Sequence, residues 1–462
     1  PWTFHLQRNS AQLFNNISNE VGLFTTSVTF TLTLLAECLV MVGIIGLLVA
    51  VEPTGALLVL LVLGSAGWLF HRMTRATVTR WGEQRQYHAE RSVQHLMQGL
   101  GGAKDVKLLG RETEFLDRFR LHHEQSARIG QRQQTLQQVP RLWLELLMIT
   151  GLTTLVITML LREGSVDNIV PTLAVFAAAA FRLLPSVNRV LGAVQSLRYD
   201  LPALNTLRTE LALGAPEQAP RNDTVRPMTG EVVVSGVGYT YPGAAAPSLV
   251  DVSLRIGNGE SIGLIGPSGS GKSTLVDVIL GLLSPTHGTV AVDGRDIAQD
   301  MRGWQDQIGY VPQSIYLTDD TLRRNVAFGL ADEQIDEEAV ERAIHAAQLD
   351  ELVASLPGGL DTFVGERGIR LSGGQRQRIG IARALYHDPA VLVLDEATSS
   401  LDGEAEQSVM DAVSRLQGEK TLLIVAHRLS TVAACDRLYR LERGSVAAQG
   451  APADLLRLAV AG

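Results

Sequence analysis

The sequence predicts two parts, an α-helical transmembrane bundle followed by a soluble α/β domain with a parallel sheet. Three observations predict this division. Apolar runs of membrane length occur only before about residue 195 of the 462 residues. From Gly230, short β-branched strands such as EVVVSGV and AVLVLDE alternate with helical segments, which is typical of a parallel sheet. A polar, proline-containing linker, residues 212–229, separates the two parts.

Composition narrows the classes of protein that fit. The net charge of −8 and the lack of a basic domain argue against a nucleic-acid partner. Cys38 and Cys435 lie far apart in unlike segments, so they predict neither a disulfide framework nor a metal site. The chain begins at Pro1 without a recognisable signal peptide, and we expect it to be the trailing part of a longer protein.

Four apolar runs predict four membrane helices within residues 1–211, at about 23–51, 54–70, 142–161 and 169–194. Because a helix rises ~1.5 Å per residue, about 20 residues cross a ~30 Å hydrocarbon core. The short breaks EPTG and REGSVDN predict two helical hairpins. A single run of this kind could also be the buried core helix of a soluble protein. Four runs with one consistent charge asymmetry favour a membrane bundle.

The segment between the hairpins, residues 71–141, is polar and helix-compatible and carries thirteen basic against seven acidic residues. By the positive-inside rule this excursion is cytoplasmic and the two short turns are external. The sequence therefore predicts a multi-pass protein of the cell (inner) membrane with its α/β domain, residues 230–462, in the cytoplasm.

A phosphate-binding loop, GPSGSGKST, follows the strand SIGLIG and opens the helical segment LVDVILGLL. Its residues are Gly266, Pro267, Ser268, Gly269, Ser270, Gly271, Lys272, Ser273 and Thr274. Glycines let backbone N–H groups curl around phosphates, and the helix N-terminus adds its positive end. Lys272 would reach the β- and γ-phosphates and Ser273 would ligate Mg²⁺. Any glycine-rich turn can match part of this pattern, but the full motif in its strand–loop–helix context predicts nucleotide binding.

Two carboxylates end the predicted strand in AVLVLDEATSSLD. Asp395 is placed to hold the Mg²⁺ shell, and Glu396 to orient or deprotonate the water that attacks the γ-phosphate. Alone, such a pair could equally cap a helix. Downstream of a phosphate-binding loop, it predicts ATP hydrolysis.

Between these motifs lies LSGGQ, and here the sequence resembles the signature of the ATP-binding cassette (ABC) family, over roughly residues 230–455. The resemblance implies that Tyr241 stacks on adenine and that Gln313, in YVPQ, senses Mg²⁺ and touches the membrane domain. VGERG resembles the exporter-specific X-loop. Asp402 resembles the D-loop residue, and His427 the switch histidine that reaches the γ-phosphate.

The same resemblance implies a dimer. In this family two cassettes pair head to tail, and each ATP lies between one phosphate loop and the partner's signature. The signature residues here are Leu371, Ser372, Gly373, Gly374 and Gln375. One cassette is present in the chain, so we expect a second copy of the chain to complete both sites, with ATP and Mg²⁺ as cofactors.

Membrane helices ahead of a cassette resemble the exporter architecture, in which each half has six membrane helices. Four are predicted here, so Pro1 to Glu20 is expected to end the first cytoplasmic loop. The segment GGAKDVKLLGRETEF, residues 101–115, is placed where the second coupling helix meets the cassette. A solvated charged helix is the simpler alternative for this segment.

Four charged residues suggest what is moved: Arg182, Arg189, Arg141 and Glu37. Charges inside a bilayer are costly and usually face a cavity or a partner, although Arg189 and Arg141 could simply reach the headgroups. Guanidinium groups suit phosphate oxygens, so the predicted cargo is amphipathic with an anionic head. Glu37 could pair with Arg182.

A second resemblance concerns the cargo. RNSAQLFNNISNEV and FRLLPSVNR are similar to PglK-type flippases of lipid-linked oligosaccharides. We therefore predict ATP-driven flipping of an anionic lipid-linked oligosaccharide or polysaccharide precursor. The alternative is a multidrug or lipid A-like exporter. A cassette ATPase acting on DNA or ribosomes is disfavoured, because such proteins lack fused membrane spans.

Overall fold

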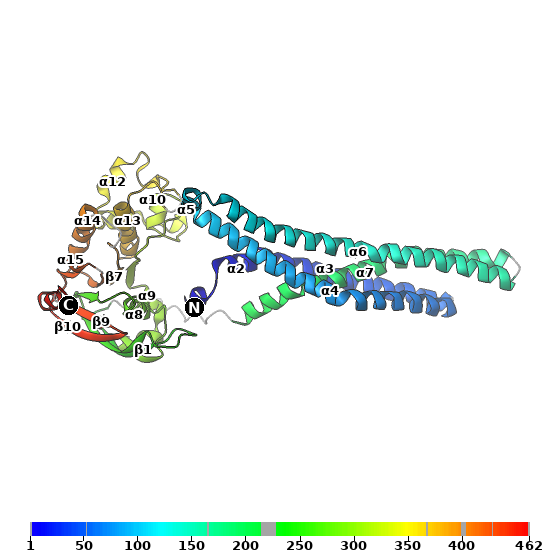
Figure 1. Cartoon of the computed structure of the whole chain (residues 1–462), viewed down its shortest axis with the longest axis horizontal. Helices are drawn as coiled ribbons and strands as arrows, with labels where there is room; N and C mark the ends of the chain where they lie inside the picture. Colours follow the sequence, from blue (N-terminus) through cyan, green and yellow to red (C-terminus); the bar gives the residue numbers. More distant parts are fainter. Residues whose placement is uncertain are drawn as a thin grey trace. The chain divides into compact units, whose positions relative to one another are not determined.

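The computed structural model describes residues 2–51, 53–163, 166–213, 228–365, 368–398, 403–426 and 428–460. The chain forms two compact units. One comprises residues 4–216, and the other comprises residues 217–462 with the first three residues. Each unit has its own architecture (Figure 1). The predicted fold class, a helical bundle followed by an α/β domain, is confirmed.

Four long helices form the first unit: α3 (Val21–Val51), α4 (Pro53–Gly101), α6 (Glu112–Glu163) and α7 (Val166–Ala212). Shorter elements precede and connect them: α1 (Trp2–Gln7), α2 (Ser10–Asn15), the π-helical η1 (Asn16–Glu20) and α5 (Ala103–Leu108). Within the unit, α3 packs along α7 and α4 along α6, and α4 also packs against α7. A glycine permits this last contact, since a Cβ on Gly82 would lie 2.2 Å from the Tyr199 carbonyl oxygen.

The predicted excursion, residues 71–141, is built from continuations of the membrane helices. Helix α4 has 49 residues and α6 has 52. At ~1.5 Å per residue each is more than twice as long as a ~30 Å hydrocarbon core, so each must extend beyond it. Helix α5 lies at the far end of this extension, inside the segment predicted as a coupling helix (Figure 1).

The four predicted spans all fall within long helices. The first, 23–51, coincides with α3, and the other three lie inside α4, α6 and α7. Within the described residues, Ser10–Ala50 is long and apolar enough to cross a membrane. The number of spans stays a prediction.

A buried acidic cluster lies where η1, α3, α4 and α7 meet. Glu20 forms an ion pair with Arg85 at 3.3 Å, and the Ser27 hydroxyl donates to Asp200 Oδ2 at 3.2 Å. Asp200 is only 3% exposed. It lies beyond the predicted span 169–194, and burial raises its pKa to about 6, with the nearby Glu20 charge adding to the rise.

We expect Asp200→Asn to stabilise the protein at pH 7.5 and to have little effect at pH 4. The raised pKa means that the folded state prefers the protonated carboxyl, so its stabilising contribution is present below pH ~4 and is lost as pH rises through 6. A difference of about two pH units corresponds to roughly 3 kcal/mol. Thermal unfolding at several pH values measures it, with the exposed Asp117→Asn as control. Equal gains at both pH values would contradict the assignment.

Two sheets form the second unit. The six-stranded sheet has the order β10-β9-β3-β8-β7-β6, and the four-stranded sheet has the order β2-β1-β4-β5. Strands of the larger sheet are β3 (Ser261–Ile265), β6 (Ile308–Val311), β7 (Val391–Asp395), β8 (Thr421–Val425), β9 (Arg437–Glu442) and β10 (Ser445–Gly450). All are parallel except β10. The smaller, antiparallel sheet contains β1 (Glu231–Tyr239), β2 (Leu249–Gly257), β4 (His287–Val292) and β5 (Arg295–Asp296).

Strands β3 and β8 are buried along their whole length, as expected for parallel strands covered on both faces. Helices of this unit are α8 (Lys272–Ile279), α9 (Met301–Gln305), α10 (Leu322–Val326), α11 (Glu337–Ala346), α12 (Asp350–Ser355), α13 (Gly373–Leu385), α14 (Gly403–Ser414), α15 (Leu429–Val432) and α16 (Pro452–Val460). Short 3-10 turns are η2 (Ile297–Gln299), η3 (Asp332–Gln334) and η4 (Gly359–Asp361). The parallel order matters most for function, because it brings the ends of β3, β7 and β6 to one edge.

Candidate nucleotide site

The predicted catalytic residues follow adjacent parallel strands. The phosphate loop follows β3, Glu396 follows β7, and Gln313 lies two residues after β6. Because the carboxyl ends of parallel strands meet at one edge, this edge is where α/β proteins bind ligands. His427, which follows β8, and Asp402 lie outside the described residues, as do Glu366 and Arg367 of the predicted X-loop.

The phosphate loop has a backbone that only glycine can adopt at two points. Gly266 has φ +148°, and a Cβ there would lie 2.2 Å from the Leu441 carbonyl oxygen. Gly271 has φ +103°, and a Cβ there would lie 2.8 Å from the Ser248 carbonyl oxygen. Gly444 N–H donates to the Ser270 carbonyl at 3.0 Å. Backbone from neighbouring segments therefore encloses the loop and holds its shape.

Lys272 lies inside the loop. Its Nζ donates to the carbonyls of Gly266 at 2.9 Å and Pro267 at 3.1 Å, and the residue is only 5% exposed. Burial lowers the pKa of the Lys272 ammonium, and the charges of Glu396 and Asp395 partly offset this. Next along α8, Ser273 is exposed. The loop thus contains the buried ammonium group of Lys272, and the exposed hydroxyl of Ser273 follows it.

Gln313 and Glu396, 83 residues apart, are brought into contact. Gln313 Nε2 donates to Glu396 Oε2 at 2.7 Å. Glu396 has φ +49°, an uncommon conformation for a residue with a side chain, and its N–H donates to the Val425 carbonyl at 3.0 Å. Gln377 of α13 donates to the Gln313 carbonyl at 3.1 Å. Hydrogen bonds through Gln313 therefore link the Glu396 carboxylate to α13, the helix that begins at the signature residues.

Two groups near this edge were not found from the sequence. Burial raises the pKa of Asp277, in α8, to about 6, and the Asp395 charge adds to the rise. Burial, followed by the charges of Asp395 and Asp277, also raises the pKa of Tyr310 in β6. Asp277 is the one acidic residue in the apolar segment LVDVILGLL, and that isolated charge could have indicated a buried carboxyl. Asp395 therefore lies close to two further buried groups, Asp277 and Tyr310, that favour their protonated forms.

Tyr241 also lies beside the phosphate loop. Its hydroxyl is 3.2 Å from Thr274 Oγ1, within hydrogen-bonding distance. Its ring packs edge-on against Tyr239 with centroids 5.0 Å apart. These contacts fix the ring near the start of α8.

The signature residues form the start of α13. Gln375 N–H donates to the Ser372 hydroxyl at 3.2 Å, while Ser372 N–H donates to Gln375 Oε1 at 2.8 Å. This reciprocal capping box explains the Ser and the Gln at that spacing. Leu371 and Gly374 are buried, whereas Ser372 is exposed at the positive end of a 13-residue helix.

The charged residues of the membrane helices pair differently from the expectation. Glu37 accepts a hydrogen bond from Arg189 Nε at 2.5 Å, rather than one from Arg182, because packing of α3 along α7 sets Glu37 beside Arg189. Arg141 pairs with Glu145 on its own helix at 2.8 Å. Arg182 is exposed and forms no ion pair within the described part of the chain. The structure thus brings together Glu37 and Arg189, and leaves Arg141 apart from them.

Long helices of membrane length, joined to an α/β domain with a phosphate-binding edge, define a membrane transport ATPase. The family described as ABC transporter matches residues 249–399. An ATP-dependent lipid A-core flippase of Burkholderia orbicola is 32% identical over 98% of this chain and 76% of its own length. One from Cupriavidus metallidurans is 34% identical over 99% and 77%.

A solved structure supports the same fold. A bacterial Atm1-family ABC exporter with ATP bound superposes with a TM-score of 0.87, over 98% of this chain and 80% of that chain, at 24% identity. The chain belongs to the ABC transporter family and is a half-transporter of the exporter type. It is a membrane protein with a cytoplasmic ATPase domain, which binds ATP and couples its hydrolysis to transport.

Proposed function

We propose that two copies of this half-transporter form a flippase. It is a multi-pass protein of the inner membrane and moves a phosphorylated lipid across that membrane. The similarity to lipid A-core flippases carries this proposal, because it spans 98–99% of the chain, membrane helices included. It favours a lipid A-like cargo over the lipid-linked oligosaccharide preferred from the sequence. Both cargoes combine an anionic head with apolar chains, and Arg182 and Arg189 suit such a head.

Hydrolysis would use the residues at the edge of the large sheet. Loop N–H groups and Lys272 bind the phosphates, and Ser273, Asp395 and Gln313 supply the hard oxygen ligands that suit Mg²⁺. Mg²⁺ would neutralise charge on the phosphate oxygens. Glu396 orients the attacking water and accepts its proton, while the 2.7 Å hydrogen bond from Gln313 fixes the carboxylate. By resemblance, Tyr241 stacks on adenine, and His427 and Asp402 complete the site.

A dimer test follows from the exposed Ser372. Asp and Asn both cap helices as well as Ser does, so either replacement keeps α13 intact. Only Ser372→Asp adds a negative charge where the partner's ATP phosphates are expected. We expect Ser372→Asp to abolish ATP hydrolysis by the dimer, while nucleotide binding to a single chain and the activity of Ser372→Asn persist. Full activity in Ser372→Asp would exclude the head-to-tail arrangement.

Transport is tested with the full-length protein in proteoliposomes. Fluorescent lipid A-type lipid, a polyprenyl-pyrophosphate-linked sugar and a cationic drug are supplied separately with ATP, and movement between leaflets is measured. We expect flipping of the lipid A-type probe, and its loss when Arg182 and Arg189 are both replaced by Ala. Movement of the sugar-linked probe alone would favour the oligosaccharide cargo. ATP-dependent movement of none of the probes would refute the proposal.

A further inference from the structure

Glu396 has a backbone conformation that neighbouring structure must hold in place. Its φ of +49° lies in the left-handed region, where a residue with a side chain persists only if its surroundings fix it. Two hydrogen bonds act on Glu396 itself, since its N–H donates to the Val425 carbonyl and its side chain accepts from Gln313. The turn that follows, residues 397–398, must be fixed as well, because a shift there would turn the carboxylate.

Thr398, two residues after Glu396, lies against a second hydroxyl. Its Oγ1 is 3.4 Å from Oγ1 of Thr431 in α15, and both residues are only 5% exposed. Thr431 Oγ1 in turn donates to Glu406 Oε1, in the first turn of α14, at 3.1 Å. Because a hydroxyl has one proton and a carboxylate only accepts, Thr431 donates to Glu406 and Thr398 donates to Thr431. A chain of hydrogen bonds thus leads from the turn after β7 to Glu406.

The other oxygen of Glu406 holds the turn after β8. Glu406 Oε2 accepts a hydrogen bond from Arg428 Nη1, so one carboxylate contacts both ends of the segment 428–431. The next residue, Val432, is buried against β3, since a Cβ on Gly263 would lie 2.8 Å from Val432 Cγ1. The segment after β8 is therefore seated on the strand that leads into the phosphate loop. Glu406 links this seated segment to the turn that follows Glu396.

The exposure of the ion pair between Glu406 and Arg428 argues against a role in folding alone. The Arg428 side chain is 45% exposed and that of Glu406 is 14% exposed. Ion pairs open to water contribute little to stability, because solvent screens their attraction. Both oxygens of Glu406, however, contact groups on the turn after β8, and through Thr431 they reach the turn after β7. A role in positioning therefore accounts for Glu406 better than a role in stability.

We propose that Glu406 is a positioning residue for ATP hydrolysis. Its carboxylate, acting through Thr431 and Thr398, holds the turn after β7 in the conformation that directs the Glu396 carboxylate. The inference rests on the proposed function in one respect, which is the role of Glu396 as proton acceptor. Because the chain of hydrogen bonds leads to the turn that carries Glu396, its loss should slow the hydrolytic step and leave ATP binding nearly unchanged.

The first test removes the carboxylate by Glu406→Ala in the full-length protein. We expect kcat to fall about tenfold, since a misplacement of about 1 Å at a reacting group can cost up to ~100-fold in rate. Phosphate release measures kcat, fluorescent-nucleotide titration measures the Kd for ATP, and thermal unfolding reports whether the variant is folded. Asp411→Ala is the matched control, because Asp411 is an exposed acid on the same helix that accepts a hydrogen bond from Gln407.

The control should hydrolyse ATP as the wild type does. An unchanged kcat in Glu406→Ala would overturn the inference. A loss of ATP affinity as large as the loss of kcat would also overturn it, because the substitution would then disturb the whole site and not the position of Glu396.

The second test changes only the hydroxyl between Glu406 and Thr398. Thr431→Val keeps the shape of the side chain but removes the hydroxyl, whereas Thr431→Ser keeps the hydroxyl. We expect Thr431→Val to lower kcat as Glu406→Ala does, and Thr431→Ser to stay close to the wild type. Equal rates in the two variants would show that the hydroxyl does not carry the effect and would contradict the inference.

Combining Glu406→Ala with Glu396→Gln separates this inference from the proposed function. If Glu406 acts through Glu396, the double variant should hydrolyse ATP no more slowly than Glu396→Gln alone, because residues that act as a unit are not additive. A further loss in the double variant would overturn the inference. If Glu396→Gln is slow but Glu406→Ala is not, the inference fails and the proposed function stands. If Glu396→Gln hydrolyses ATP at the wild-type rate, the proposed role of Glu396 fails, and the inference fails with it.

Discussion

Replacing Glu396 with Gln is expected to lower ATP hydrolysis by at least about 100-fold while leaving ATP binding intact. General-base catalysis typically contributes about 10²–10⁴-fold, and Gln keeps the shape of the side chain but cannot accept the proton of water. Gln313, which donates to Glu396 Oε2 at 2.7 Å, can instead donate to the new amide oxygen. Phosphate release from the full-length protein measures hydrolysis, and fluorescent-nucleotide titration measures binding.

The Glu396 variant should also hold ATP in the paired state, because the step that separates the two cassettes no longer occurs. Retention of labelled ATP on the protein after rapid desalting would detect this longer-lived paired state. Glu419→Gln, an exposed residue far along the chain, should hydrolyse ATP at the wild-type rate. Hydrolysis by Glu396→Gln within twofold of wild type would exclude Glu396 as the proton acceptor.

Replacing Gly266 with Ala is expected to abolish nucleotide binding. The Cβ would lie 2.2 Å from the Leu441 carbonyl oxygen, which is backbone and cannot rotate away, and φ +148° is strained for any residue but glycine. Together, backbone strain and overpacking should lower the free energy of unfolding by roughly 2–6 kcal/mol. Lys272 would move too, because its Nζ donates to the Gly266 carbonyl.

Gly269→Ala is the matched control for this substitution. Gly269 also has a positive φ, +78°, but a Cβ there meets no atom within 4 Å. Gly269→Ala should lower the free energy of unfolding by only about 1–2 kcal/mol and leave measurable nucleotide binding. Nucleotide titration and thermal unfolding compare the two variants. Equal losses in both would show that the positive φ, and not the close contact with Leu441, makes Gly266 necessary.

The ABC family of the second unit was predictable because its main motifs are local. GPSGSGKST and LSGGQ each lie within a few consecutive residues, so both can be recognised along the chain. LSGGQ also caps its own helix through Ser372 and Gln375, whereas neighbouring backbone holds the shape of the phosphate loop. The division into helical and α/β parts was predictable for a similar reason, since apolar length and strand alternation are read along the chain.

Contacts between distant segments were not predictable. Gln313 meets Glu396 only because β6 lies beside β7 in the larger sheet, and chain order does not specify strand order. Asp277 lies near Asp395 because of how α8 sits on that sheet, and burial then raises its pKa.

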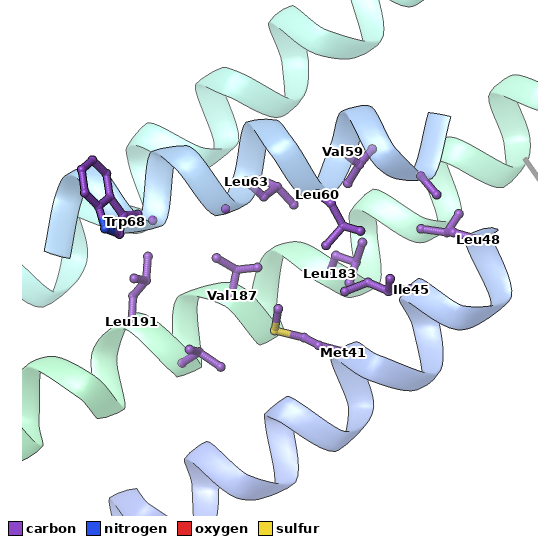
Figure 2. Close-up of a pocket in the computed structure, with 14 residues that line it drawn as sticks. Met41, Ile45, Leu48, Val59, Leu60, Leu63, Trp68, Leu183, Val187 and Leu191 are labelled. Atoms are coloured by element: carbon purple, nitrogen blue, oxygen red, sulfur yellow. The ribbon is translucent and has the colours of Figure 1, made fainter. Parts of the chain in front are cut away.

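The membrane helices show the same distinction. Charge and hydropathy alone predicted an apolar bundle with a basic excursion and singled out Glu37, Arg182 and Arg189 as unusual. Tertiary packing decided that Glu37 pairs with Arg189, because α3 packs along α7 (Figure 2). Local sequence thus predicted the candidate phosphate-binding residues and determined which segments are apolar. Which of them meet depended on helix register and strand order, because those follow from the packing of the whole fold.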